Sequence, residues 1–192
     1  MTTPPAPKPA AEKLRVLVDT REQLPLEFNP ERVVAVRATL ATGDYSLEGY
    51  QDAVSIERKS VPDLVQCLTW ERERFWRELE RLRAMPFAAV LVEGDWRDLV
   101  AHKFQSQAST QSIVASVMAI QTRFCPVMFA SDHRHAALYV EQLLSRWLRD
   151  LQANATGGAE DFTPDELAAI LAANGMKLSK YLALPAASGV KP

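Results

Sequence analysis

The stretch GDYSLEGYQDAVSIERK, residues 43–59, decides the fold, because it has the pattern of two short β-strands joined by a tight loop. An antiparallel hairpin with GYQD as its loop pairs Tyr45 with Ile56, and the apolar side chains of both strands then share one face of the sheet. The same register places Asp44 opposite Glu57 on the polar face. We therefore predict a core-facing hairpin that brings two carboxylates together.

This pair of carboxylates is unfavourable alone, since directly opposed residues have Cβ atoms roughly 4.5–5.5 Å apart and like charges so placed repel. A divalent cation between Asp44 and Glu57 would remove the conflict, and Mg²⁺ accepts carboxylates, a backbone carbonyl, water and phosphate as ligands. Lys59 projects to the same side as Glu57, where its ammonium could stabilise charge that grows on phosphorus. Plainer interpretations are a turn residue at Asp44 and a surface ion pair between Glu57 and Lys59. Together these residues favour a site that hydrolyses phosphodiesters.

Further acids stand near this predicted site. Asp19 ends the apolar run LRVLVD, which is typical of a buried strand, and strand ends commonly carry site residues in α/β sheets. In DTRE, Asp19 or Glu22 could add a metal ligand and Arg21 could clamp a phosphate. Asp63 follows Ser60 by three residues at a predicted helix start, so helix capping and catalysis both fit it.

The rest of the chain predicts a mixed α/β sheet with covered faces, because strands alternate with helices after residue 60. FAAVLVEG, residues 87–94, is apolar enough for a strand buried on both faces. A long helix is predicted over 133–151, with His133 and His135 exposed at its start. The predicted organisation is a disordered Pro/Ala-rich tail (1–12), a main domain (13–152), a linker (153–162) and a short helical C-terminal segment (163–192).

Composition excludes some classes of protein. The 192 residues carry a net charge of −2, so a strongly basic nucleic-acid coat protein is excluded, whereas a protein with one local DNA-binding patch is not. No apolar run reaches the roughly 18 residues of a membrane span, and the first residues lack the apolar core of a secretion signal. We expect a cytoplasmic protein in which Cys67 and Cys125 are buried free thiols.

The segments VLVDTRE, GDYSL and IERKSVPDL, in this order and spacing, resemble the XPF-type structure-specific DNA nucleases. The resemblance covers residues 14–147 and implies a restriction-endonuclease-like core, with a mixed central sheet flanked by helices. It implies a metal-dependent endonuclease that cuts one strand near a branch, flap or junction and works as a dimer. It also implies the metal ligands Asp44, Glu57, the backbone carbonyl of Arg58 and, as a further ligand, Asp19. The full catalytic set that it implies is Asp19, Glu22, Asp44, Glu57, Arg58, Lys59 and Asp63.

DNA contacts are expected from basic residues around this site. The charged helix ERERFWRELERLR has nearly balanced charges, so most of it should be a solvated amphipathic face. The candidate DNA-binding residues are Arg21, Arg72, Arg74, His102 and Lys103, the last two in a predicted polar loop.

The sequence thus predicts an endonuclease of DNA repair or recombination that uses Mg²⁺, with Mn²⁺ as a substitute, and that is phage or prophage encoded. Its expected partners are branched DNA, a second copy of the chain and a recruiting repair or replication protein, with no membrane. Two alternatives stay open. One is a catalytically silent DNA-binding scaffold or partner subunit of the same fold, and the other is a Holliday-junction resolvase or a restriction-type nuclease.

Overall fold

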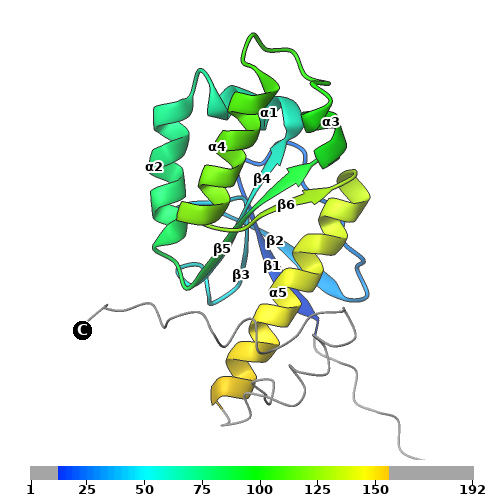
Figure 1. The fold of residues 1–192 in the computed structure, drawn as a ribbon. Coiled ribbons are helices and arrows are strands. Elements are labelled where there is room, and N and C mark those ends of the chain that lie inside the picture. Colours follow the sequence, from blue (N-terminus) through cyan, green and yellow to red (C-terminus); the bar gives the residue numbers. More distant parts are fainter. Residues whose placement is uncertain (1–12, 156–192) are drawn as a thin grey trace, which may run out of the picture. The chain divides into compact units, whose positions relative to one another are not determined.

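A computed structural model describes residues 13–155, which form a six-stranded mixed sheet with helices on both sides (Figure 1). The strand order is β2-β1-β3-β4-β5-β6. Strand β1 pairs parallel with β2 and antiparallel with β3, and β4 pairs antiparallel with β3 and parallel with β5. The strands are β1 (Leu14–Asp19), β2 (Val33–Ala38), β3 (Tyr45–Leu47), β4 (Val54–Ser60), β5 (Phe87–Glu93) and β6 (Val127–Ala130).

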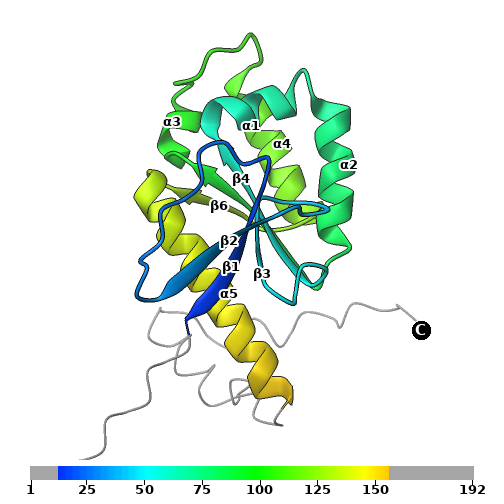
Figure 2. The same ribbon diagram turned by 180° about the vertical axis from the view of Figure 1, so that it is seen from behind.

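The helices cover the two faces of the sheet. They are α1 (Val61–Leu68), α2 (Arg72–Arg83), α3 (Trp96–Val100), α4 (Thr110–Arg123) and α5 (His133–Ala155). Figures 1 and 2 show α1, α2 and α4 grouped on one side, while α5 crosses the other. Strand β5 is buried at every residue between its two ends, and its Val90 and Val92 join the core beneath α1, α2 and α4. Alternation turns Ala89 and Leu91, also buried, to the opposite face. The mixed, covered sheet predicted from the sequence is therefore confirmed.

The hairpin register predicted from the alternation is confirmed at Tyr45, which pairs with Ile56. The connection between β3 and β4 is longer than the predicted loop and spans residues 48–53. Strand β4 also continues to Ser60, directly before α1. This extension lets β4 carry Glu57, Arg58 and Lys59 as regular strand residues, with successive side chains on opposite faces.

The chain divides into two compact units, residues 1–147 and 148–192. The first contains the whole sheet. Of the second, the structure describes only the end of α5, which is helical to Ala155 and so continues past the predicted helix end at 151. The predicted tail (1–12) and C-terminal segment (163–192) lie outside the described residues. Within residues 13–155, no helix is both long and apolar enough to cross a membrane. Cys67 and Cys125 are buried and free, as predicted.

Candidate active site

Gly43 sets the position of the first acid. Its φ of +76° is a conformation that residues with a side chain rarely adopt, and a Cβ there would meet Ser55 Oγ at 1.9 Å. The Ser55 hydroxyl in turn donates to the carbonyl of Thr42 at 3.0 Å. Only glycine lets the chain pass this close to β4, and the next residue, Asp44, enters the sheet as a result.

Asp44, the residue before β3, bonds to the strands on both sides of β3, β1 and β4, through its own polar groups. Its carbonyl accepts from the Asp19 N–H at the end of β1 (2.8 Å), and its N–H donates to the Ile56 carbonyl of β4 (2.9 Å). Its carboxylate accepts from the backbone N–H of Arg58 at 2.7 Å. The side chain is therefore fixed over β4, on the side where Glu57 and Lys59 lie.

Glu57 is almost fully buried, and its carboxylate is ion-paired with the Lys59 ammonium two residues along the same strand. The Lys59 ammonium also lies 5.7 Å from the centre of the Phe75 ring on α2. This packing holds the long Lys59 side chain against the sheet rather than in open solvent. The structure thus brings Asp44, Glu57 and Lys59 into one electrostatically coupled group.

The charges of this group conflict. Burial raises the pKa of Asp44 to about 6, against the lowering effect of the Arg58 N–H and of Lys59. Burial, followed by the neighbouring Asp44 carboxylate, raises the pKa of Glu57 to about 8. Although burial disfavours the charged form of Lys59, the Glu57 carboxylate outweighs it and raises the pKa of the ammonium. Two acids share one cation, so the group carries excess negative charge when both acids are ionised.

The side chain of Arg58 points away from those of its neighbours Glu57 and Lys59 in β4 and has a structural role. Its guanidinium donates to Glu93 at the end of β5 (2.8 Å from Nε), to the Leu24 carbonyl (3.2 Å) and to Glu22 (3.4 Å). It also lies 3.3 Å from the ring of His133, the first residue of α5. Arg58 therefore ties the segment after β1 and the start of α5 to the edge of the site. Its backbone N–H, as described, holds Asp44.

Asp19 is buried and fully engaged. Its carboxylate accepts from the Arg21 backbone and guanidinium (2.7–3.1 Å) and from the Leu40 N–H (2.7 Å). Burial acts to raise the pKa of Asp19, but the hydrogen bonds from Arg21 and Leu40 outweigh it and lower the pKa. Asp19 thus stays ionised and fixes the loop after β1, and the Arg21 guanidinium that it holds reaches the site.

A pocket of about 320 Å³ opens beside this group. Predicted site residues from the loop after β1, from the residue before β3, and from β4 and α1 line it. The α2 region adds Glu71 and Arg74, which are ion-paired. Asp63 also lines the pocket. Its backbone N–H donates to the Ser60 hydroxyl at 3.2 Å, and that hydroxyl donates to the Asp63 carboxylate at 2.6 Å. The lining residues that bear on the chemistry are Arg21, Glu22, Asp44, Arg58, Lys59, Asp63, Glu71 and Arg74.

The other predicted DNA-binding residues lie outside this pocket. Arg72 donates to the Leu68 carbonyl and the Ser116 hydroxyl (both 3.1 Å) and stacks over Trp76, so it joins α1, α2 and α4. His102 is 2.9 Å from Thr110 and Lys103 donates to Asp98 at 2.8 Å. Figure 1 shows their loop, between α3 and α4, at the same end of the sheet as α1.

Sequence reasoning missed two groups at the site. Glu78 on α2 adds its negative charge to the field at Asp44, Glu57 and Lys59. Its spacing of four residues from Arg74, which lines the pocket, could have indicated the shared helix face. His133 was expected to be exposed, but its ring lies 3.2 Å from Glu93 and 3.3 Å from the Pro25 carbonyl. Only the tertiary packing of α5 brings it there.

The donor atoms fit a hard divalent cation. Asp44 and Glu57 supply carboxylate oxygens. Burial raises the pKa of both acids, and neighbouring carboxylates raise it further, so a bound cation would offset the cost of ionising them. Within the described part of the chain, no three Asp, Glu, His or Cys side chains are placed to enclose a metal by themselves. Two carboxylates would leave the remaining positions to a carbonyl, water and phosphate, which is how Mg²⁺ usually binds.

The chain resembles solved structures of XPF from Aeropyrum pernix. One matches with a TM-score of 0.55 and 25% identity, over 69% of this chain and 61% of that one. A second, solved in complex with DNA, matches with a TM-score of 0.55 and 24% identity, over 71% of this chain and 66% of that one. The chain therefore spans less than two thirds of these relatives. A search of the curated proteins found no match.

The mixed six-stranded sheet and its flanking helices define an XPF-type nuclease fold. The chain belongs to the family that carries the ERCC4 domain, whose model matches residues 18–143. The family and the fold that the motif segments predicted are thus confirmed.

Proposed function

We propose that this protein is a divalent-metal-dependent endonuclease that cuts one strand of DNA near a branch, flap or junction. The observation that carries the proposal is the coupled group of Asp44, Glu57 and Lys59, held in the sheet beside an open pocket. Membership of the ERCC4 family and the likeness to an XPF structure solved with DNA support the substrate class.

The residues have distinct roles in this proposal. Asp44, Glu57 and the Arg58 carbonyl would hold Mg²⁺, with Mn²⁺ as a substitute. Glu22, which lines the pocket, would extend the ligand set, while Asp19, whose carboxylate already accepts from Arg21 and Leu40, would position the loop after β1. A bound cation supplies Lewis-acid activation of the scissile phosphate and of the attacking water. Lys59 stabilises the negative charge that grows on the phosphate, Arg21 and Arg74 contact neighbouring phosphates, and Asp63 orients water.

The test compares cleavage of labelled flap, fork, four-way junction, duplex and single-stranded DNA in Mg²⁺ or EDTA. We expect metal-dependent nicking that is strongest near branches and that falls at least about 100-fold in Asp44→Asn and Lys59→Ala. Asp52→Asn is the matched control, because Asp52 is an exposed acid in the loop at the other end of the same hairpin.

The outcomes separate the proposal from its alternatives. Cleavage that survives in both site variants would contradict the assigned residues, and inertness of the wild-type protein on every DNA would favour a silent scaffold. Cleavage of four-way junctions alone would favour a resolvase, and cleavage of duplex at a preferred sequence a restriction-type enzyme.

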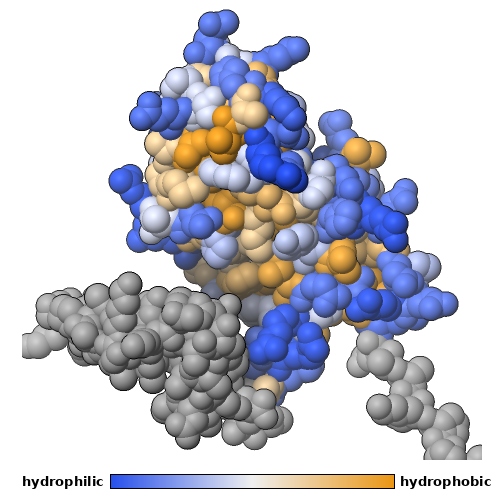
Figure 3. Space-filling view, turned by 45° about the vertical axis from the view of Figure 1, so that its right-hand side comes forward, coloured by the Kyte–Doolittle hydropathy of each residue, from blue (hydrophilic) through white to orange (hydrophobic). Residues whose placement is uncertain are grey.

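We also propose that the protein acts as a homodimer in the cytoplasm, recruited to DNA by a repair or replication protein. The support for a dimer is the exposure of Leu138 and Tyr139 on α5, which are about half exposed. Figure 3 shows apolar patches bordered by polar side chains on the face that it draws. Light scattering of the full chain tests this proposal, and a monomer at micromolar concentration would contradict it.

A further inference from the structure

Trp70 is the most exposed large apolar side chain among the described residues, with 89% of its surface open to solvent. Tryptophan is strongly buried on average in folded proteins, so an indole this exposed is a candidate binding group. Trp70 lies in the turn between α1 and α2, directly beside the candidate active site.

This turn is held in a defined conformation. The backbone N–H groups of Thr69 and Glu71 both donate to the Gln66 carbonyl (3.1 and 3.2 Å), and the Thr69 hydroxyl donates to the Val65 carbonyl (2.8 Å). The hydrogen bonds fix the residues on either side of Trp70 to the last turn of α1. The indole is therefore presented to solvent by an ordered backbone, as a docking group needs to be.

The hollow around Trp70 continues into the candidate active site. It measures about 810 Å³ and is lined by residues 69–74 and Arg77. Glu71 and Arg74 line both this hollow and the pocket that contains Asp44 and Lys59. A DNA strand that leaves the candidate active site can thus pass Arg74 and reach Trp70 along the protein surface.

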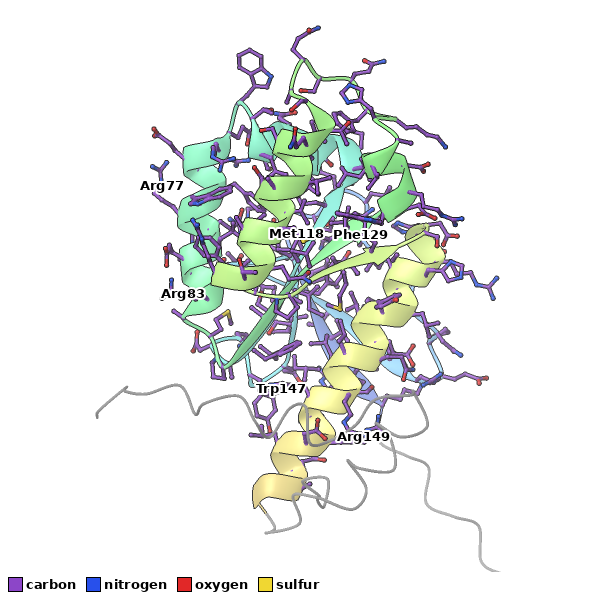
Figure 4. All side chains as sticks on the ribbon, in the orientation of Figure 1. Arg77, Arg83, Met118, Phe129, Trp147 and Arg149 are labelled. Atoms are coloured by element: carbon purple, nitrogen blue, oxygen red, sulfur yellow. The ribbon has the colours of Figure 1, made fainter. Side chains whose placement is uncertain are left out.

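Three arginines and two glutamates line the hollow, and this excess of positive charge favours a phosphate-bearing ligand. Arg77 projects outward from α2 (Figure 4), and within residues 13–155 its guanidinium has no ion-pair partner. Glu71 is already engaged by Arg74 and by the Gln66 amide, so it offers little repulsion. A protein partner would need further apolar side chains around the indole, whereas Trp70 is surrounded mainly by charged ones.

We propose that Trp70 stacks on an unpaired base of the DNA strand that runs from the candidate active site, while Arg77 binds an adjoining phosphate. This inference rests on the proposed function and names the substrate feature that the site reads. A base offers a flat face for the indole whatever its identity, so the contact selects unpaired DNA rather than a sequence.

The test measures binding of labelled oligothymidylate, blunt duplex and flap DNA to the full chain by fluorescence anisotropy in EDTA. We expect Trp70→Ala to weaken oligothymidylate and flap binding about tenfold, to leave duplex binding within about twofold, and Trp70→Phe to retain most of the affinity. Arg77→Ala should reduce the slope of log binding constant against log salt concentration by the amount expected for about one phosphate contact. Arg83, which is exposed at the other end of α2, provides the matched control Arg83→Ala.

Two results would overturn the inference: unchanged oligothymidylate affinity in Trp70→Ala, or an equal loss on duplex DNA. Either result leaves the proposed function intact if the wild-type protein still nicks branched DNA and Asp44→Asn does not. If the wild-type protein binds none of these DNAs and cleaves none of them, both proposals fail together.

Discussion

At the scale of single residues, Asp44 shows how the site is built from a local conflict. Gly43 lets the chain approach β4, the Arg58 N–H fixes the carboxylate, and Glu57 then faces it across the strands. Natural sequences are locally consistent except where function requires otherwise. Two partly dehydrated acids that share one lysine are such an exception, and they should lower the stability of the metal-free protein.

Asp44→Asn should therefore stabilise the protein in EDTA at pH 7.5. The folded state raises the pKa of Asp44 to about 6, so it binds this proton more tightly than the unfolded chain does. The free energy of unfolding consequently falls as pH rises from about 4 to about 6, and the loss persists above that range. Asparagine still accepts the Arg58 N–H and removes the charge. We expect about 1–2 kcal/mol of added stability at pH 7.5 and little difference near pH 4, measured by urea unfolding.

Adding Mg²⁺ or Mn²⁺ to the same samples provides the complementary measurement. The melting temperature of the wild-type protein should rise, because the ion binds only the folded state, while that of Asp44→Asn should not. A variant that is less stable than wild type at pH 7.5 in EDTA, or that gains as much from Mg²⁺, would show that Asp44 is not under electrostatic strain. Asp52→Asn should differ from wild type by less than about 0.5 kcal/mol.

At the scale of elements, the start of α1 combines a structural and a chemical position. Ser60 accepts from the Asp63 N–H as the N-cap, and both residues line the site pocket. Helix capping accounts for Ser60 fully. Helix capping does not explain why the Asp63 carboxylate lies in the pocket. Substitutions at Ser60 and Asp63 separate the capping role from the chemical role.

We expect Ser60→Ala to reduce stability by about 1 kcal/mol, because α1 loses its side-chain cap, and to leave nicking within about twofold below the melting temperature. Asp63→Asn should have a similar or smaller effect on stability but lower nicking at least about tenfold, since the acid can no longer orient water. Urea unfolding and single-turnover cleavage measure the two effects. Equal nicking by the two variants would restrict Asp63 to capping.

The elements also show what the sequence could predict. The pairing of Tyr45 with Ile56 followed from alternation, because a strand has a strict period of two and only one register buries the apolar side. The partners of Arg58 could not be derived in this way. Glu93 and His133 lie 35 and 75 residues further along the chain, and only the packing of β5 and α5 brings them to it. Local pattern therefore predicted the acids, and tertiary packing decided their surroundings.

At the scale of the whole molecule, the sheet, α1 and α2 together determine the electrostatic character of the site. The core beneath α1 and α2 buries the acids, and Glu78 on α2 adds a further negative charge. Protons and metal ions therefore compete for the same carboxylates, so the metal requirement should depend on pH.

We expect the Mg²⁺ concentration that gives half-maximal nicking to rise at least about tenfold as pH falls from about 8 to about 6. The sign follows from the raised pKa values of Asp44 (about 6) and Glu57 (about 8), which make protonation compete with metal in this range. Nicking titrations at each pH measure it. Mn²⁺, which binds oxygen and nitrogen ligands more tightly than Mg²⁺, should displace the curves to lower concentration. An unchanged Mg²⁺ requirement across this range would contradict the assignment of these acids as ligands.

The backbone of Asp44 has one more consequence. Its carbonyl and N–H join the end of β1 to β4, directly before β3 begins, so the reactive acids belong to the hydrogen-bonded sheet rather than to a surface loop. Local fraying cannot pull them apart, and the amide hydrogens of Asp19 and Asp44 should be among the last to exchange with deuterated solvent. We therefore expect nicking activity and folded structure to be lost at the same temperature on heating, without a folded form that is inactive.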